Sequence, residues 1–279
     1  MASALNDEDP PEERRMTFFE HLEELRARLK RVVIAFLVAF IITLTFSFQP
    51  VDLGGTTVWL PLPTLQQNET IPAQLFQVLN ESLVQGSARI IVTSAPEAVV
   101  IQLKVAMFLA VILTSPVMTV EFWRFVAPGL KPKERRLIFR LTAPVVILFV
   151  AGVLMSLLVV LPFTFPFLYT FARGLGAEPL LTVEAFLDFV VMFSLGFGLA
   201  FELPVVMYGL SYLGIVQPDF WKKNWRYAAI AIFIFGAVIT PDGSGITMML
   251  VALQMLVLYA AGYAAIVLRS RRGTGAKSS

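Results

Sequence analysis

The chain has 279 residues, of which 57% are hydrophobic and 15% are charged, and its mean hydropathy is +0.75. Because a soluble globular domain carries about 25% charged residues, this composition indicates a polytopic membrane protein. The sequence has no cysteine, which excludes disulfides and thiolate metal sites, and its single histidine argues against a multi-histidine metal site.

The N-terminal segment, residues 1–16, is polar and acidic. It lacks the apolar core of a cleavable signal peptide and is too acidic for a transit peptide, so we expect a disordered tail. The next stretch, "TFFEHLEELRARLKR" at residues 17–31, has apolar residues at helical spacing. It predicts an amphipathic helix that leads into the first membrane span.

Six apolar segments are candidate membrane spans, since a helix of about 20 residues crosses the hydrocarbon core. They lie at residues 32–48, 98–125, 137–161, 186–213, 227–240 and 246–268, and the fifth is short. Prolines within the second, third and fourth segments are expected to bend these helices. The prediction is an all-α polytopic membrane protein with six transmembrane helices in a bent, cupped bundle.

A long polar loop, residues 49–95, separates the first two predicted spans. Within it, residues 72–85 place Leu75, Leu79 and Leu83 on one stripe, which predicts a short helix that caps the outer face of the bundle.

Lysine and arginine are distributed unevenly along the chain. Nineteen of the 22 lie before the first span, in the loops after the second and fourth spans, or after the sixth. The positive-inside rule therefore predicts that both termini are cytoplasmic. The chain is read as one membrane domain, residues 17–268, followed by a cytoplasmic tail, residues 269–279.

Three acids precede the first span, and they have different explanations. Thr17 and Glu20 have the spacing of a capping box, and Glu23 fits a solvated face. Glu24 lies beside the apolar stripe, where it could pair with Arg28 four residues later.

Three further acids are candidate functional residues. Glu134 lies in the basic loop "KPKERR", either as a stray carboxylate or as a group that pairs with an incoming cation. Glu202 lies within the fourth span, where a charge costs about 2.5–3.5 kcal/mol; it either faces a cavity or is a protonated carboxyl bonded to a neighbouring helix. Asp242 lies in the turn "TPDGSG", which turn chemistry alone can explain.

The sequence shows no catalytic constellation. One histidine near a helix start cannot serve a triad at the other side of the membrane, and there is no phosphate-binding loop or dinucleotide fingerprint. We expect neither an enzyme nor a cofactor, metal or nucleic-acid site.

Four separated motifs resemble the TatC family, the multispanning receptor of the twin-arginine protein translocase. They are "HLEELR" at residues 21–26, "WRFVAPGL" followed by "KERR" at residues 123–136, "FELPV" at residues 201–205, and "TPD" at residues 240–242. The resemblance covers residues 18–268 in order, and it implies a cupped six-helix fold.

The resemblance also implies a function. The chain would be a receptor and core subunit in the bacterial cytoplasmic (inner) membrane that binds twin-arginine signal peptides of folded proteins. It would recruit TatA-like and TatB-like single-span subunits, in a hetero-oligomer of several copies, for export driven by the proton-motive force. The signal-peptide site would comprise Glu24, Arg26, Phe125, Glu134, Arg135 and Arg136. Glu202 would face docking partner helices, and Asp242 would be the acid of the last outer turn.

Elementary chemistry agrees with this role, because a carboxylate can accept both donors of a guanidinium fork and two adjacent arginines require two acids.

The short fifth segment predicts local bilayer thinning and a docking edge for partner helices. Two alternatives stay open: a proton-coupled small-solute transporter that uses Glu202, and a membrane-insertion chaperone or scaffold in which the acids only cap helices.

Overall fold

The computed structural model describes residues 18–275 apart from residues 53, 55–56, 65, 67–68, 85–87, 130, 177–179 and 241–244. The first element, α1 (Phe18–Thr45), is one continuous helix. The predicted amphipathic lead and first span are therefore parts of one helix. It ends three residues before the predicted limit of the span, because Phe46 begins a β-strand.

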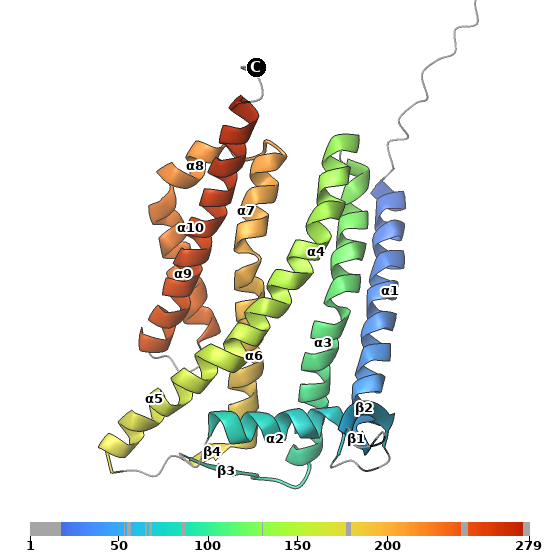
Figure 1. Ribbon diagram of the computed structural model, residues 1–279, viewed down its shortest axis with the longest axis vertical. Helices are drawn as coiled ribbons and strands as arrows, with labels where there is room; N and C mark the ends of the chain where they lie inside the picture. The colour runs from blue at the N-terminus through green and yellow to red at the C-terminus, as the bar shows by residue number, and fades with distance from the viewer. Residues whose placement is uncertain are drawn as a thin grey trace, which may run out of the picture.

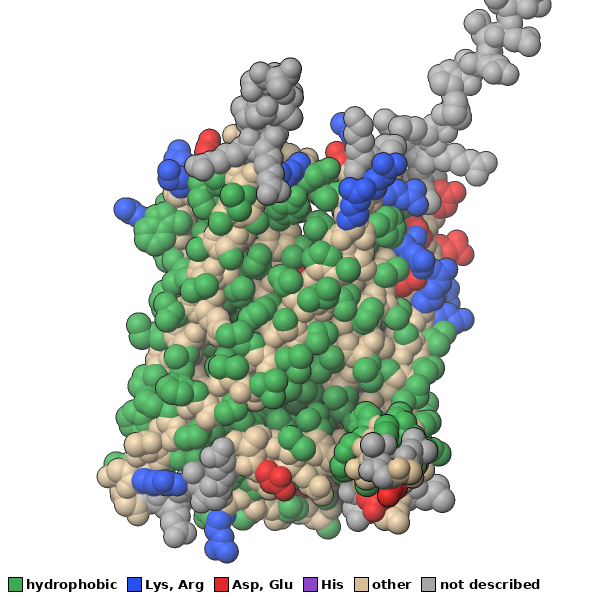
Figure 2. All heavy atoms as spheres, in the orientation of Figure 1, with side chains coloured by type: hydrophobic (Ala, Val, Ile, Leu, Met, Phe, Trp, Pro, Cys, Tyr) green, Lys and Arg blue, Asp and Glu red, His purple; other side chains and the backbone are tan. Residues whose placement is uncertain are grey.

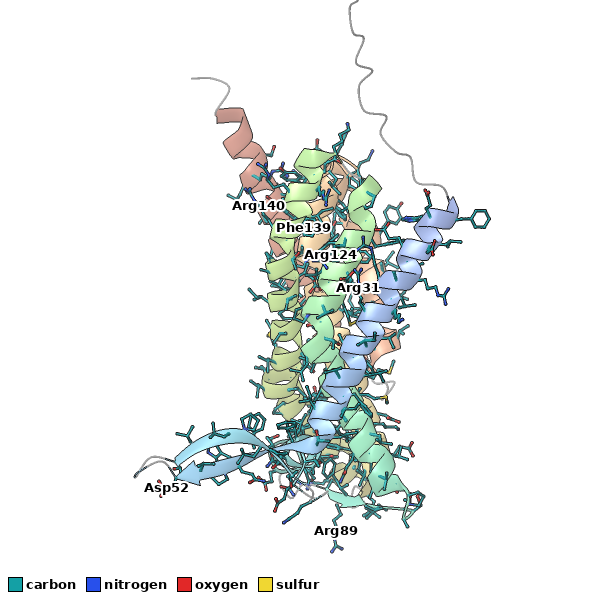
Figure 3. All side chains as sticks on the ribbon, turned by 90° about the vertical axis from the view of Figure 1, so that its right-hand side faces the viewer. Arg31, Asp52, Arg89, Arg124, Phe139 and Arg140 are labelled. Carbon is teal, nitrogen blue, oxygen red and sulfur yellow. The ribbon has the colours of Figure 1, made fainter. Side chains whose placement is uncertain are left out.

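A β-hairpin follows α1 at the lower end of the molecule. Strands β1 (Phe46–Asp52) and β2 (Thr57–Pro63) pair antiparallel. The hairpin projects sideways from the foot of α1, with Asp52 near its tip (Figure 3). A second small sheet joins β3 (Arg89–Ile91) to β4 (Leu180–Thr182) in parallel. The prediction of a purely α-helical fold was therefore incomplete.

The outer helix predicted from the leucine stripe is present. Helix α2 (Ile71–Leu83) buries Leu79 and Leu83, and Leu75 packs against the core. It lies across the lower ends of the long helices (Figure 1). This confirms that the long loop between the first two predicted spans contains a helix that caps one end of the bundle.

The second and third predicted spans form the longest helical segments of the first half. Helix α3 (Glu97–Val126) begins one residue before the second predicted span and passes into a short 3₁₀ turn (Ala127–Gly129). Helix α4 (Pro132–Met155), a π-helical turn (Ser156–Val160) and α5 (Leu161–Gly174) follow one another without a break. This segment runs diagonally across the bundle and extends well past the predicted end of the third span (Figure 1).

The fourth predicted span is divided in two. Helix α6 (Val183–Phe201) and α7 (Leu203–Tyr212) are separated at Glu202, directly before Leu203 and Pro204. A proline lacks the N–H that would continue the helical ladder, which explains an interruption here. By contrast, Pro116 and Pro144 lie inside helices that continue through them.

The last elements are the short α8 (Pro218–Lys223), α9 (Trp225–Ile239) and α10 (Gly245–Gly275). Helix α9 is short, as predicted. Helix α10 continues past residue 268, so the expected tail is partly helical.

Four helical stretches of the described residues are long and apolar enough to cross a membrane: Glu97–Gly129, Glu134–Gly174, Val183–Tyr212 and Gly245–Ser270. Helix α9 is apolar but shorter. Helix α1 is long, but its basic residues restrict its apolar part to residues 32–45. Basic side chains gather at the upper end of the molecule, and the middle band of the visible face is largely hydrophobic (Figure 2).

The core lies where α6 crosses its neighbours. Phe186, Phe193 and Phe197 of α6 are fully buried. Glycines permit a close approach of α4 and α6: a Cβ at Gly152 would lie 2.6 Å from the carbonyl oxygen of Phe197. Small residues at helix crossings are typical of membrane bundles, in which packing provides the association energy.

Candidate functional site

The upper half of α1 is held against α3 by one buried carboxylate. Glu121, with 6% of its side chain exposed, accepts hydrogen bonds from Arg124 at 2.8 Å, Arg31 at 3.2 Å and Arg28 at 3.3 Å. Burial of an unpaired carboxylate is costly, and three guanidinium groups offset that cost here. Glu121 therefore fixes the relative position of α1 and α3.

Arg28 joins this cluster to Glu24, the acid singled out from the sequence. Its guanidinium forms a salt bridge with Oε1 of Glu24, in which Nε lies 3.0 Å from that oxygen, and it also reaches Glu121. The expected i,i+4 pair is present. The other carboxylate oxygen of Glu24, Oε2, is buried and has no hydrogen-bond partner. It lies 4.0 Å from Nδ1 of His21.

An aromatic contact borders the same patch. The imidazole of His21 stacks on the ring of Phe125, with centroids 4.4 Å apart and planes inclined by 21°. Phe125 lies in the last turn of α3, at the end of the second predicted span. We call the group His21, Glu24, Arg28, Glu121 and Phe125 the α1–α3 patch.

The second predicted acid belongs to a different element. Glu134 is in the first turn of α4, and its carboxylate accepts a hydrogen bond from the backbone N–H of Lys131 at 3.0 Å. Arg135 and Arg136 follow it and are exposed. The starts of α4 and α1 both lie at the upper end of the molecule (Figure 1). No hydrogen bond or ion pair of the described residues joins Glu134 to Glu24.

The remaining predicted basic residue, Arg26, is exposed on α1 and forms no ion pair with any described residue. The labelled residues Arg31 and Arg124 lie between α1 and α3, where the patch is built (Figure 3). Glu24 and Phe125 therefore lie in the same patch, on either side of His21, whereas Arg26 is not part of it.

Glu202 lies at the break between α6 and α7, beside an apolar pocket of about 290 Å³. The pocket is lined by Val111, Ser115, Met118, Thr119, Val145, Phe149, Leu195, Leu199 and Glu202. The hydroxyls of Ser115 and Thr119 bond to carbonyls of their own helix, and Oε1 of Glu202 is buried without a hydrogen-bond partner. The pocket therefore offers one polar group on an apolar wall. Thr17 and Asp242 lie outside the described residues.

Sequence reasoning missed several paired acids. Glu121 had a readable signal, since it is an acid near the end of an apolar segment, three residues before Arg124. Glu97 accepts from Thr93 N at 2.5 Å, Thr93 Oγ1 at 2.7 Å and Ser94 N at 3.1 Å. Lys104, within the second predicted span, forms salt bridges with Glu184 and Asp188 on α6.

The chain is similar to known proteins along most of its length. A family profile described as "Sec-independent protein translocase protein (TatC)" matches residues 20–253. A TatC protein of Cenarchaeum symbiosum is 39% identical over 88% of this chain and 93% of its own length. One of Carboxydothermus hydrogenoformans is 34% identical over 89% of this chain and 91% of its own length.

A solved structure agrees with the sequence relatives. The crystal structure described as "Twin Arginine Translocase Receptor- TatC in DDM" superposes with a TM-score of 0.71 at 29% identity, over 88% of this chain and 98% of that one. The family profile, the sequence relatives and the solved structure all point to the same family. The chain belongs to the TatC family of Sec-independent protein translocase proteins, a family of transport proteins rather than enzymes.

Proposed function

We propose that this chain is the signal-peptide receptor of a twin-arginine translocase and binds the paired arginines at its upper end. The observation that carries the proposal is the buried, unpartnered Oε2 of Glu24 within the α1–α3 patch. A carboxylate oxygen without a donor keeps an unused capacity to accept a charge-assisted hydrogen bond, which an arginine of another protein would fill on displacing its neighbours. The solved relative is itself described as a twin-arginine translocase receptor.

The proposed binding surface uses one acid for each arginine. Glu24 would accept the first guanidinium next to the stacked rings of His21 and Phe125, which supply an apolar and aromatic wall. Glu134 would accept the second from the start of α4. Arg26, Arg135 and Arg136 flank these acids and would complete the surface.

The proposal places the upper end in the cytoplasm, with six spans and both termini on that side. The four long apolar helices supply four of the spans, and α1 and α9 supply the other two. The gathering of basic side chains at the upper end supports this orientation in a cytoplasmic membrane. The chain would act in a hetero-oligomer of several copies, with export driven by the proton-motive force.

Two features are proposed as docking positions for TatA-like and TatB-like single-span helices. The pocket beside Glu202 offers an apolar wall with one carboxyl group, which a polar residue of a partner helix could bind. Helix α9 has 15 residues, about 22 Å of helix, against a hydrocarbon core of about 30 Å. Such a mismatch thins the bilayer or favours helix association.

Photo-crosslinking tests the receptor role. A peptide carrying a twin-arginine motif, with a photoreactive residue beside it, is incubated with membranes that contain the chain. Crosslinks are expected at the upper end, and replacement of both arginines by lysines should reduce them because lysine lacks the planar fork. Glu24→Ala and Glu134→Ala should each reduce crosslinking as well.

Glu23→Ala is the matched control, since Glu23 is adjacent to Glu24 but exposed. Equal crosslinking of Glu24→Ala, Glu134→Ala and the parent chain, at equal protein level, would reject the site. The same assay separates the alternatives, because neither a small-solute transporter using Glu202 nor a scaffold with helix-capping acids discriminates paired arginines from paired lysines.

A further inference from the structure

A second pocket lies at the upper end, apart from the α1–α3 patch and from Glu202. It has a volume of about 260 Å³ and is lined by Tyr208, Ser211, Pro218, Ile266, Arg269 and Ser270. These residues come from the ends of α7 and α10 and from the start of α8, which lie side by side in Figure 1.

Arg269 supplies the charge of this pocket. Its guanidinium carbon lies 3.7 Å from the ring centroid of Tyr212 and 5.6 Å from that of Tyr208. Stacking on a ring uses the face of the guanidinium and leaves its N–H edge free. Arg269 forms no hydrogen bond or ion pair within the described part of the chain. The edge is therefore available to an anion.

Hydrogen bonds join the three helices that line the pocket. Trp221 of α8 donates from Nε1 to Oγ of Ser211 at 2.8 Å, and the hydroxyl of Tyr259 on α10 donates to the carbonyl of Trp221 at 2.7 Å. The rings of Trp221 and Tyr259 also meet edge to face. These contacts tie α8 to both α7 and α10, so the pocket is preformed.

The surroundings of the pocket carry excess positive charge. Lys222, Lys223 and Arg226 are exposed at the junction of α8 and α9, and none forms an ion pair with a described residue. Asp219 is the acid of the adjoining α8 segment. The resulting potential favours a negatively charged ligand.

The pocket also lies at the level expected for lipid head groups. Leu268, directly before Arg269, is 61% exposed and ends the apolar surface of α10. Trp225 and Tyr227 at the start of α9 are 54% and 73% exposed. Exposed tryptophan and tyrosine at the end of a membrane helix are typical of the interface between hydrocarbon and water.

We propose that this pocket binds the phosphate of an anionic glycerophospholipid, with Arg269 as the principal ligand and Tyr208 and Ser211 as neighbouring polar groups. The acyl chains would extend along the exposed apolar surface below, beside Leu268. This lipid site is separate from signal-peptide recognition, and its existence does not depend on that role.

Native mass spectrometry of the full chain in detergent tests the proposal. The chain is titrated with dioctanoyl phosphatidylglycerol, dioctanoyl phosphatidylcholine or inorganic phosphate, and retained molecules are counted. Saturable binding of phosphatidylglycerol is expected, with weaker binding of the zwitterionic lipid. Arg269→Gln should weaken phosphatidylglycerol binding about tenfold through the loss of a charge-assisted contact. Arg269→Lys should have a smaller effect, because it keeps the charge without the fork.

Arg89→Gln is the matched control, since Arg89 is exposed at the lower end, where it points away from the bundle (Figure 3). Equal binding by Arg269→Gln and the parent chain would overturn the proposal. The proposal would also be overturned if Arg269→Gln lowered thermal stability but left lipid binding unchanged, because the stacked arginine would then have a structural role alone. Displacement of the lipid by inorganic phosphate at equal concentration would instead identify a site for free anions. If Arg269→Gln does not fold, the Arg269→Lys titration decides between these outcomes.

Discussion

Arg28 on α1 donates a hydrogen bond to Glu121 on α3 across 3.3 Å, although the two residues are 93 positions apart in the chain. The same guanidinium holds Glu24. The orientation of the proposed arginine-binding acid is therefore set by a residue of another helix, through one shared arginine.

Glu121→Ala should destabilise the protein. Removal of one partner from a buried ion pair costs about 3–5 kcal/mol, and we expect about 2 kcal/mol because Arg31 and Arg124 can turn to solvent. The midpoint of thermal unfolding in detergent, followed by circular dichroism, should fall relative to Glu23→Ala. Twin-arginine crosslinking should fall too, since Arg28 is then free to occupy both oxygens of Glu24. An unchanged midpoint would show that Glu121 does not hold α1 against α3.

Gly152→Ala should disrupt the crossing of α4 and α6. The added Cβ would lie 2.6 Å from a backbone oxygen, which cannot move aside as a flexible side chain could. Overpacking of this kind costs about 1–3 kcal/mol. Gly209→Ala is the control: its Cβ would lie 3.7 Å from Leu141 Cδ1, an ordinary contact. Thermal unfolding of the two variants should differ clearly, and equal midpoints would contradict the close approach.

Glu97→Gln should loosen the junction between α3 and the small sheet. Its Oε2 accepts three hydrogen bonds, from two donors of Thr93 and from the N–H of Ser94, and its Oε1 accepts one from the N–H of Glu184 at 3.4 Å. An amide has a single acceptor oxygen, so it cannot accept at both positions. We expect a loss of about 1–3 kcal/mol. Hydrogen exchange at β3 should accelerate, whereas Glu81→Gln on the exposed face of α2 should leave it unchanged. Equal exchange in both variants would argue against the capping role.

Either of the two acids bound to Lys104 should be sufficient to stabilise it. It lies 3.0 Å from Glu184 Oε1 and 2.7 Å from Asp188 Oδ1, and each acid is more than half exposed. Glu184→Gln or Asp188→Asn alone should cost less than about 1 kcal/mol, since exposed pairs contribute little. The double variant leaves the half-buried lysine without an acid, so its loss of stability should exceed the sum of the single losses. A double-mutant cycle measures this coupling, and strict additivity would refute it.

The sequence predicted elements whose signal is local. The leucine stripe of α2, the extent of α3 to within one residue at each end and the short length of α9 were all readable, because helical periodicity and apolar length are properties of a single segment. The hairpin of β1 and β2 was missed, although aromatic and β-branched residues flank a glycine turn in which Gly54 has a φ of +68°.

Features that depend on distant partners were not predicted. The unbroken passage from α4 to α5 was missed because the predicted span was ended at the length that a bilayer needs, although the apolar sequence continues. Glu121 was not singled out from the sequence, because Arg28 and Arg31 reach it from α1 only in the folded chain. The signal for Glu24 was partly local, through Arg28, but its unpartnered oxygen depends on packing against α3.

The diagonal course of α4 and α5 has a mechanical consequence. The apolar stretch Glu134–Gly174 has 41 residues, and a helix of that length measures about 62 Å, roughly twice the hydrocarbon thickness. Because the segment is tilted, its upper end and its lower end are also separated sideways, in the plane of the membrane. If the segment formed by α4 and α5 rotated slightly about its crossing with α6 at Gly152, the Glu134 end and the Gly174 end would move in opposite directions.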